Sequence, residues 1–165
     1  MKKNSSRNTI LISAAAGLAA GVILTAAAIV TIMPSMMIQT HPSRLDFNQT
    51  VSTLKKNIID SGWVISTVSD MNRSMARHNV EFGPRVKLIK LCKPEYAKSI
   101  LETDRYISTM MPCTFSVWED KGGQVYLSKI NMGLMARMFG GNIARIMGGK
   151  VAKEEHKMLS GIIME

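Results

Sequence analysis

One stretch near the N-terminus, Thr9–Met33, limits the class of protein to which this chain can belong, because its 25 residues include no charged side chain. Ala, Ile, Leu and Val dominate the stretch. At about 1.5 Å rise per residue, a helix of this length crosses a hydrocarbon core of roughly 30 Å with some tilt. The sequence therefore predicts one transmembrane anchor over residues 9–33.

The charges that flank this stretch predict its orientation. Lys2, Lys3 and Arg7 precede it, whereas no basic residue occurs in the seven positions after Met33. Positive residues tend to stay on the cytoplasmic side of a membrane. We therefore expect residues 1–8 to be a cytoplasmic N-terminus and the protein to be a single-pass protein of the inner (cytoplasmic) membrane, with its domain on the periplasmic or extracellular side.

A cleaved secretory signal is the competing interpretation, because Ala26, Ala27 and Ala28 are small residues of the kind that a signal peptidase accepts. Apolar regions of signal peptides usually run about 7 to 15 residues. The longer stretch here favours an uncleaved signal anchor.

A stripe of small residues within the span predicts contact with another membrane helix. It consists of Ser13, Gly17, Gly21 and Thr25, which recur at every fourth position. Such a stripe lets two helix backbones approach closely, although small residues are common in membrane helices for other reasons. Self-association as a homo-oligomer, or docking on a membrane-protein partner, is therefore a prediction that rests on this pattern alone.

The rest of the chain is mildly basic. Residues 34–45 are expected to form a juxtamembrane linker, and three of the 21 basic residues precede the span, so 18 basic and 12 acidic residues follow it. This balance suits contact with membrane lipid of anionic headgroup, or with an acidic partner. Nucleic acid is not an expected partner, because the basic residues are mixed with acidic ones and the domain is expected outside the cytoplasm.

Hydrophobic periodicity predicts a domain over residues 46–130 that mixes helices and strands, followed by a Gly/Met-rich helical extension over 131–165. The fold class is α+β, with a single antiparallel sheet and helices on one face. The expected elements are helices at 46–59, 71–78 and 94–103, and strands from 63, at 85–92, 109–118 and 124–130.

The residues from Phe47 to Ile130 resemble the domain of unknown function family 302. That resemblance implies a single α+β domain similar to the TATA-binding-protein-like arrangement, and it implies no established activity. The C-terminal extension looks like an addition found in membrane-attached members. The features that carry the resemblance are Phe47 with the helix Thr50–Ile59, Gly62-Trp63, Val80-Glu81-Phe82, Lys87–Leu91, Cys92-Lys93-Pro94, Met111-Pro112-Cys113 and Phe115–Trp118.

The two cysteines, Cys92 and Cys113, are the main candidates for chemistry. One follows a predicted strand and the other begins the next, so antiparallel neighbours would bring them close together. Three outcomes stay open: a disulfide, a redox or soft-metal pair, or two separate buried cysteines. Lys93 and the helix that begins at Pro94 would favour a thiolate on Cys92, and Pro112 completes the candidate redox or ligand site.

Other residues predict packing or solvent contact. Methionine is frequent, with 14 in the chain, and soft thioethers can bind Cu(I). Helical spacing instead favours a C-terminal packing face of Met132, Met135, Phe139, Ile143 and Ile146. Glu154 and Glu155 are expected to be solvated.

No motif in the sequence identifies a reaction or a cofactor. The three histidines, His41, His78 and His156, are far apart, and neither a nucleophile elbow nor a phosphate-binding loop occurs. We therefore expect a membrane-anchored, exported binding or accessory module rather than an enzyme. Two alternatives remain, a thiol-disulfide or small redox enzyme that uses the cysteines and a structural subunit of a membrane complex.

Overall fold

The structure is a computed structural model that describes residues 3–164. Met1, Lys2 and Glu165 lie outside the described residues, and with them one lysine of the basic N-terminal flank. The chain divides into two compact units, an N-terminal helix up to Met36 and a domain that starts at Met37.

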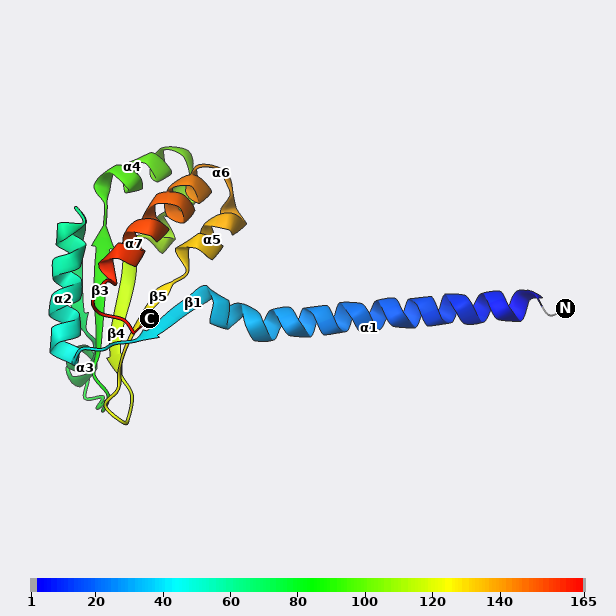
Figure 1. Cartoon of the computed structure of the whole chain (residues 1–165), viewed down its shortest axis with the longest axis horizontal. Helices are drawn as coiled ribbons and strands as arrows, with labels where there is room; N and C mark the ends of the chain where they lie inside the picture. Colours follow the sequence, from blue (N-terminus) through cyan, green and yellow to red (C-terminus); the bar gives the residue numbers. More distant parts are fainter. Residues whose placement is uncertain (1–2, 165) are drawn as a thin grey trace. The chain divides into compact units, whose positions relative to one another are not determined.

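The N-terminal unit is the helix α1, Lys3–Met37 (Figure 1). Its stretch Ser13–Met37 is long and apolar enough to cross a membrane. This stretch ends four residues later than the predicted span, because the helix continues through Pro34. Ser13, Gly17, Gly21 and Thr25 are all exposed on α1, so a partner for this stripe stays a prediction.

The domain contains five strands and several helices (Figure 1). In chain order they are β1 (Ile38–Pro42), α2 (Phe47–Asp60), β2 (Val64–Asp70), α3 (Met71–Ala76), β3 (Val86–Cys92), α4 (Pro94–Thr103), the 3₁₀ helix η1 (Arg105–Met110), β4 (Cys113–Glu119), β5 (Val125–Ile130), α5 (Met132–Phe139), α6 (Gly141–Ile143), the π-helical stretch η2 (Ala144–Val151) and α7 (Ala152–Met158).

All five strands form one sheet in the order β1-β5-β4-β3-β2, and every neighbouring pair is antiparallel. The predicted α+β class with a single antiparallel sheet is therefore confirmed. β4 and β5 form the expected hairpin, in which Trp118 pairs with Tyr126 and their rings stack 4.6 Å apart.

β1 is an element that the sequence did not predict, and the expected linker over residues 34–45 is wrong. The strand forms because all five of its residues pair with the edge of β5, from Ile38 opposite Ile130 to Pro42 opposite Tyr126. A further bond, from the amide of Asn131 to the carbonyl of Met37 at 2.8 Å, extends the pairing to the first residue of the domain. Tertiary pairing, rather than local propensity, makes this strand.

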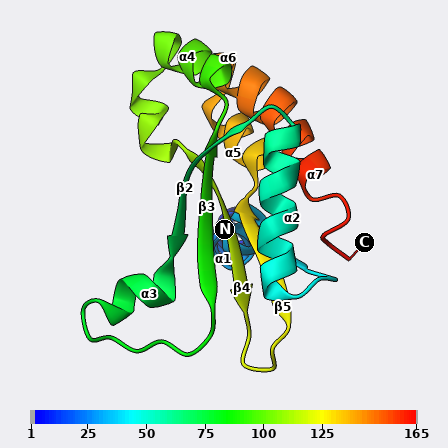
Figure 2. The same cartoon turned by 90° about the vertical axis from the view of Figure 1, so that its left-hand side faces the viewer.

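The core lies between the sheet and the helices. Alternate side chains of the central strands point inward, as in the buried set Phe115, Val117 and Leu127. The helix α2 packs against β2, β3 and β4 and also touches α7, and Figure 2 shows both helices on the same side of the sheet. Its apolar face buries Leu54 and Ile58 completely, as helical spacing predicts.

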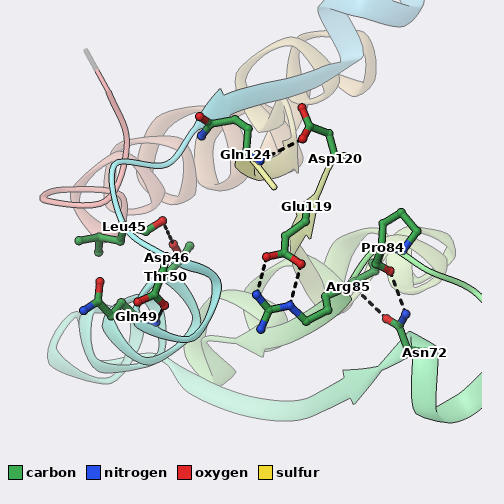
Figure 3. A network of polar contacts seen from close by, with 11 residues as sticks. Leu45, Asp46, Gln49, Thr50, Asn72, Pro84, Arg85, Glu119, Asp120 and Gln124 are labelled. Atoms are coloured by element: carbon green, nitrogen blue, oxygen red, sulfur yellow. Dashed lines mark hydrogen bonds and ion pairs between the residues drawn. The ribbon is translucent and has the colours of Figure 1, made fainter. Parts of the chain in front are cut away.

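Polar contacts join the loops at the end of the sheet where α2 begins (Figure 3). The carboxylate of Asp46 caps α2 by accepting the amide hydrogen of Gln49 at 2.9 Å. Arg85, directly before β3, forms an ion pair with Glu119 at the end of β4. The side-chain amide of Asn72 donates to the carbonyl of Pro84 at 2.8 Å, so the loop before β3 is held to α3.

The C-terminal segment belongs to the core rather than standing apart from it. Met132, Ile143 and Ile146 of the predicted packing face are buried, and Met135 is half-buried. Phe139 is 39% exposed, with its ring 6.4 Å from that of Tyr106. The face is interrupted because α5 ends at Phe139, where Gly140 takes a φ of 69°.

Candidate functional site

The sequence-predicted site residues converge on one small pocket. Cys92, Lys93, Pro112 and Cys113 all line it, whereas Pro94 starts α4 and lies outside the lining. The pocket has a volume of about 30 Å³, which is enough for about two water molecules. Its other walls are mainly apolar and come from Trp63, Leu91, Tyr96, Ala97, Ile100, Met111, Met147 and Val151.

The two cysteines are free, so the disulfide alternative is not formed. The register between β3 and β4 explains this result, because Cys113 lies opposite Leu91 and not opposite Cys92. Cys92 lies one residue beyond the end of this ladder, and it lines the same pocket as Cys113 without a bond between the two sulfur atoms.

Neither cysteine is activated as a thiolate. Burial, with a smaller contribution from Glu95, raises the pKa of Cys92, which contradicts the expected effect of Lys93 and the α4 terminus. Burial also raises the pKa of Cys113 to about 12. Across residues 3–164, no group of three or more His, Cys, Asp or Glu side chains could hold a metal ion.

Glu154 organises the rim of this pocket, and the expectation that it is solvated is wrong. Its carboxylate accepts hydrogen bonds from Trp63 Nε1 at 2.6 Å, Lys93 Nζ at 2.9 Å and the Tyr96 hydroxyl at 2.6 Å. Desolvation opposes ionisation of this carboxyl, but the bonds from Tyr96, Lys93 and Trp63 lower its pKa overall. All three hydrogen bonds come from groups of the protein, so the carboxylate holds α7 to the start of α4 and to the residue before β2 rather than standing ready for a reaction.

Glu155, the next residue, is 2% exposed and also contradicts the solvated prediction. Its Oε2 atom lies 3.0 Å from Nζ of Lys129 on β5. Burial raises the pKa of the Glu155 carboxyl, and Lys129 acts in the opposite direction. The two residues join α7 to the sheet through a buried ion pair.

A larger cleft opens beside this ion pair, between β1, β5 and α7. Its volume is about 610 Å³, within the range of small-molecule sites. Gln39 and His41 reach it from β1, and Lys129 from β5. Lys153, His156 and Lys157 lie at positions i, i+3 and i+4 of α7, which share one helix face. We call this group of six residues the basic cleft.

The basic cleft has an excess of positive charge. None of its described lining residues is acidic, and a second hollow of about 440 Å³ that shares His156 and Lys157 adds Arg44 to the same region. Within the described chain, the side chains of His41, Lys153, His156 and Lys157 have no hydrogen-bond or ion-pair partner. Burial, together with Lys129 and His156, lowers the pKa of His41. The cleft therefore offers a ligand the unpaired ammonium groups of Lys153 and Lys157, beside imidazole groups that can donate hydrogen bonds.

Sequence reasoning missed the basic cleft, because its residues come from three segments that only the fold brings together. The signal that could have revealed it is the spacing of Lys153, His156 and Lys157, three basic residues on one face of a helix whose other face is buried. Nothing in the local sequence indicates that His41 joins them, since the strand β1 was itself unexpected.

Comparison with known proteins agrees with this architecture. No curated protein matches the chain significantly. A crystal structure described as that of an uncharacterized conserved protein DUF302 from Bacillus stearothermophilus superposes with a TM-score of 0.68 at 14% sequence identity, covering 77% of this chain and 98% of that one. This likeness shows the same fold.

A family model for the domain of unknown function DUF302 matches residues 39–165. The match includes both β1 and the C-terminal segment, whereas the residues that carried the sequence resemblance ran only from Phe47 to Ile130. The apolar helix α1 precedes the matched region and is an addition to it. The chain thus belongs to the DUF302 family, the domain of unknown function described by that model.

Proposed function

We propose that this protein is a membrane-anchored binding module, whose domain lies outside the cytoplasm and binds a small anionic group of the phosphate type in the basic cleft. The observation that carries the proposal is the convergence of unpaired basic side chains on a cleft of about 610 Å³. Lysine and histidine side chains that lack an acidic partner attract anions, and a concave site holds them against competing water.

Lys129 supports this proposal in a particular way. It lines the cleft at 9% exposure, and its ammonium group is held by Glu155 at 3.0 Å. An ammonium has three donors. A bound anion can accept a hydrogen bond from this fixed group while the exposed Lys153 and Lys157 of α7 supply further ammonium groups.

Thiol-disulfide chemistry has less support than anion binding. A reactive cysteine needs a low pKa and access to its partner thiol. Here the pKa of each cysteine is raised, both thiols are free, and Cys113 is paired across the strands with Leu91 rather than with Cys92. The pocket between them, at about 30 Å³, also has little room for a substrate.

The topology is tested by protease accessibility in intact cells from which the outer barrier has been removed. With the positive flank inside, a protease outside the cytoplasmic membrane should digest the domain and leave the anchor. A domain that stays protected until the membrane is lysed would contradict the proposed orientation. A chain that begins after Ala28 in the mature protein would show that the signal is cleaved.

Anion binding is tested by titrating the full chain, in a neutral detergent, with inorganic phosphate. We expect saturable shifts of the ring signals of His41 and His156 in nuclear magnetic resonance spectra. The double variant K153Q/K157Q should weaken binding, whereas K55Q/K121Q removes the same charge from exposed sites outside the cleft and should not. Shifts that fail to saturate, or that both double variants weaken equally, would reject the site.

A further inference from the structure

We infer that the anion held by the basic cleft is the headgroup phosphate of an anionic phospholipid in the same membrane that α1 spans. This inference rests on the proposed function and identifies the source of its ligand. It assigns the domain a second attachment to the membrane, through β1, β5 and α7, in addition to the helix.

The connection between the helix and the cleft is short. The apolar stretch Ser13–Met37 has 25 residues, and at 1.5 Å per residue it is about 38 Å long, which exceeds a hydrocarbon core of roughly 30 Å. Its C-terminal end therefore reaches the headgroup layer when the helix spans a membrane without strong tilt. The strand β1 starts at the next residue, Ile38.

Covalent connectivity alone limits how far the cleft can be from those headgroups. Gln39 and His41 line the cleft and follow Met37 by two and four residues. At about 3.3 Å per residue, His41 lies within roughly 13 Å of the helix end. A lipid phosphate is thus always present near the cleft at high local concentration, whereas a soluble anion must arrive by diffusion.

The composition of the cleft fits a phosphodiester at a membrane surface. Lys153 and Lys157 are exposed on the same face of α7, and long lysine side chains reach a headgroup while their stems stay against the protein. Leu159 and Ile163 also line the cleft, and the half-buried Ile163 presents apolar surface beside the basic groups while Leu159 is buried. A lipid presents this same combination of a charged phosphate and an adjoining apolar part. An acidic peptide would not use the apolar surface in this way, so the lipid is favoured.

Native mass spectrometry of the full chain in neutral detergent can test this inference. The lipids to compare are dioleoyl phosphatidylglycerol, which is anionic, and dioleoyl phosphatidylcholine, which is not. We expect tighter binding of the phosphatidylglycerol. Each lysine near a lipid surface contributes about 1 kcal/mol, so the K153Q/K157Q variant should bind phosphatidylglycerol roughly thirtyfold more weakly.

The matched control is K55Q/K121Q, in which one lysine lies on α2 and the other in the β4–β5 turn. It should keep the wild-type preference for phosphatidylglycerol to within about twofold. Both double variants change exposed side chains only, so loss of the fold is not expected, and circular dichroism verifies it. An equal loss in both variants would overturn the inference, because general charge rather than the cleft would then attract the lipid.

The phosphate titration described above separates failure of this inference from failure of the proposed function. Saturable phosphate binding without a preference for phosphatidylglycerol would overturn the lipid assignment and leave an anion-binding module. Displacement of phosphatidylglycerol by a poly-glutamate peptide at a lower total concentration of negative charge would also overturn it, in favour of an acidic protein partner. Absence of binding to phosphate and to phosphatidylglycerol would reject both proposals.

Discussion

Nζ of Lys129 lies 3.0 Å from Oε2 of Glu155, and the two side chains are only 8% and 3% exposed. A charge in such a position is stable only while its partner is present, because desolvation of a lone ion costs several kcal/mol. The pair joins the strand next to the sheet edge to the last helix. Of the two residues, Lys129 also lines the basic cleft.

Removing one member of this pair should therefore destabilise the domain more than removing both. We expect E155L or K129M alone to lower the free energy of unfolding by about 3 to 5 kcal/mol, and K129M/E155L to lower it by less than either single change. Denaturant titration of the full chain, followed by circular dichroism, measures all four proteins. Additive effects would show that the two charges do not depend on each other.

The carboxylate of Glu154 should stabilise the rim of the cysteine pocket through its three donors. The variant E154Q keeps the size of the side chain and removes its charge, so we expect a loss of about 1 to 3 kcal/mol in stability. The fluorescence of Trp63, observed in a W118F background, should also shift because its indole N–H loses an ionic acceptor. E102Q, on an exposed pair of α4, is the matched control and should change stability by less than about 0.5 kcal/mol.

Thiol labelling should find two unreactive cysteines that differ in accessibility. Because burial raises the pKa of both, each is a protonated thiol at neutral pH, and Cys92, which is half-buried, should react before the buried Cys113. The measurement is the mass of maleimide adducts over time, with C92S and C113S assigning each step. A mass two protons lower after air oxidation would reveal a disulfide and contradict the register described here.

Stability should fall as the pH drops through the range in which free histidine titrates. The pKa of His41 in the folded domain lies below its ordinary value of 6.5, so the unfolded chain takes up this proton first. The free energy of unfolding should thus decrease as the pH falls below about 6.5, and level off below the folded pKa. Burial comes first among the causes, and Lys129 and His156 act in the same direction.

Thermal unfolding at pH 7.5 and pH 5.5 measures this effect, and H41Q should lose less stability over the interval than the wild type. H78Q removes an exposed histidine outside the cleft and provides the control. A wild-type protein that is equally stable at both pH values would contradict the lowered pKa of His41.

The contact between α5 and η2 should tolerate a methyl group at one glycine and not at its neighbour. A Cβ atom on Gly148 would lie 3.1 Å from Cβ of Ala136, whereas one on Gly149 would have nothing within 4 Å. We expect G148A to destabilise the domain by about 1 to 3 kcal/mol through overpacking. G149A should be neutral or stabilising by up to about 1 kcal/mol, because alanine favours helical backbone. Equal midpoints in thermal unfolding would argue against close packing of these helices.

Patterns within single segments were sufficient to predict most of the fold. The helix α2 was visible in the spacing of its apolar residues, and β3 and β5 in their alternation. In contrast, β1 contains Gln39, Thr40 and His41 and ends in a proline, so only the presence of β5 beside it makes it a strand.

The candidate site was harder to predict for a related reason. Sequence reasoning correctly gathered Cys92 and Cys113 at one end of the sheet, but a shift of one residue in register decides whether two side chains meet. Glu154 and Glu155 look like ordinary surface residues, and only their partners on other elements reveal that they are held inside. A single sequence contains no signal for such distant partners.

The position of β1 also fixes an order of events during synthesis. This strand follows α1 directly and is among the first parts of the domain to be made, yet its ladder partner is β5, with Ile38 opposite Ile130. The contacts at the end of β1 with the C-terminus form even later, because they need residues 163 and 164. Ser43 forms a β-bridge with Ile163, and the amide of Met164 donates a hydrogen bond to the carbonyl of Pro42 at 3.0 Å. Contacts between such distant parts of a chain form slowly. The ribosome must therefore synthesise almost the whole polypeptide before β1 can pair with its partner strand. A domain translocated across a membrane during translation would cross it as an unfolded chain and fold after translocation.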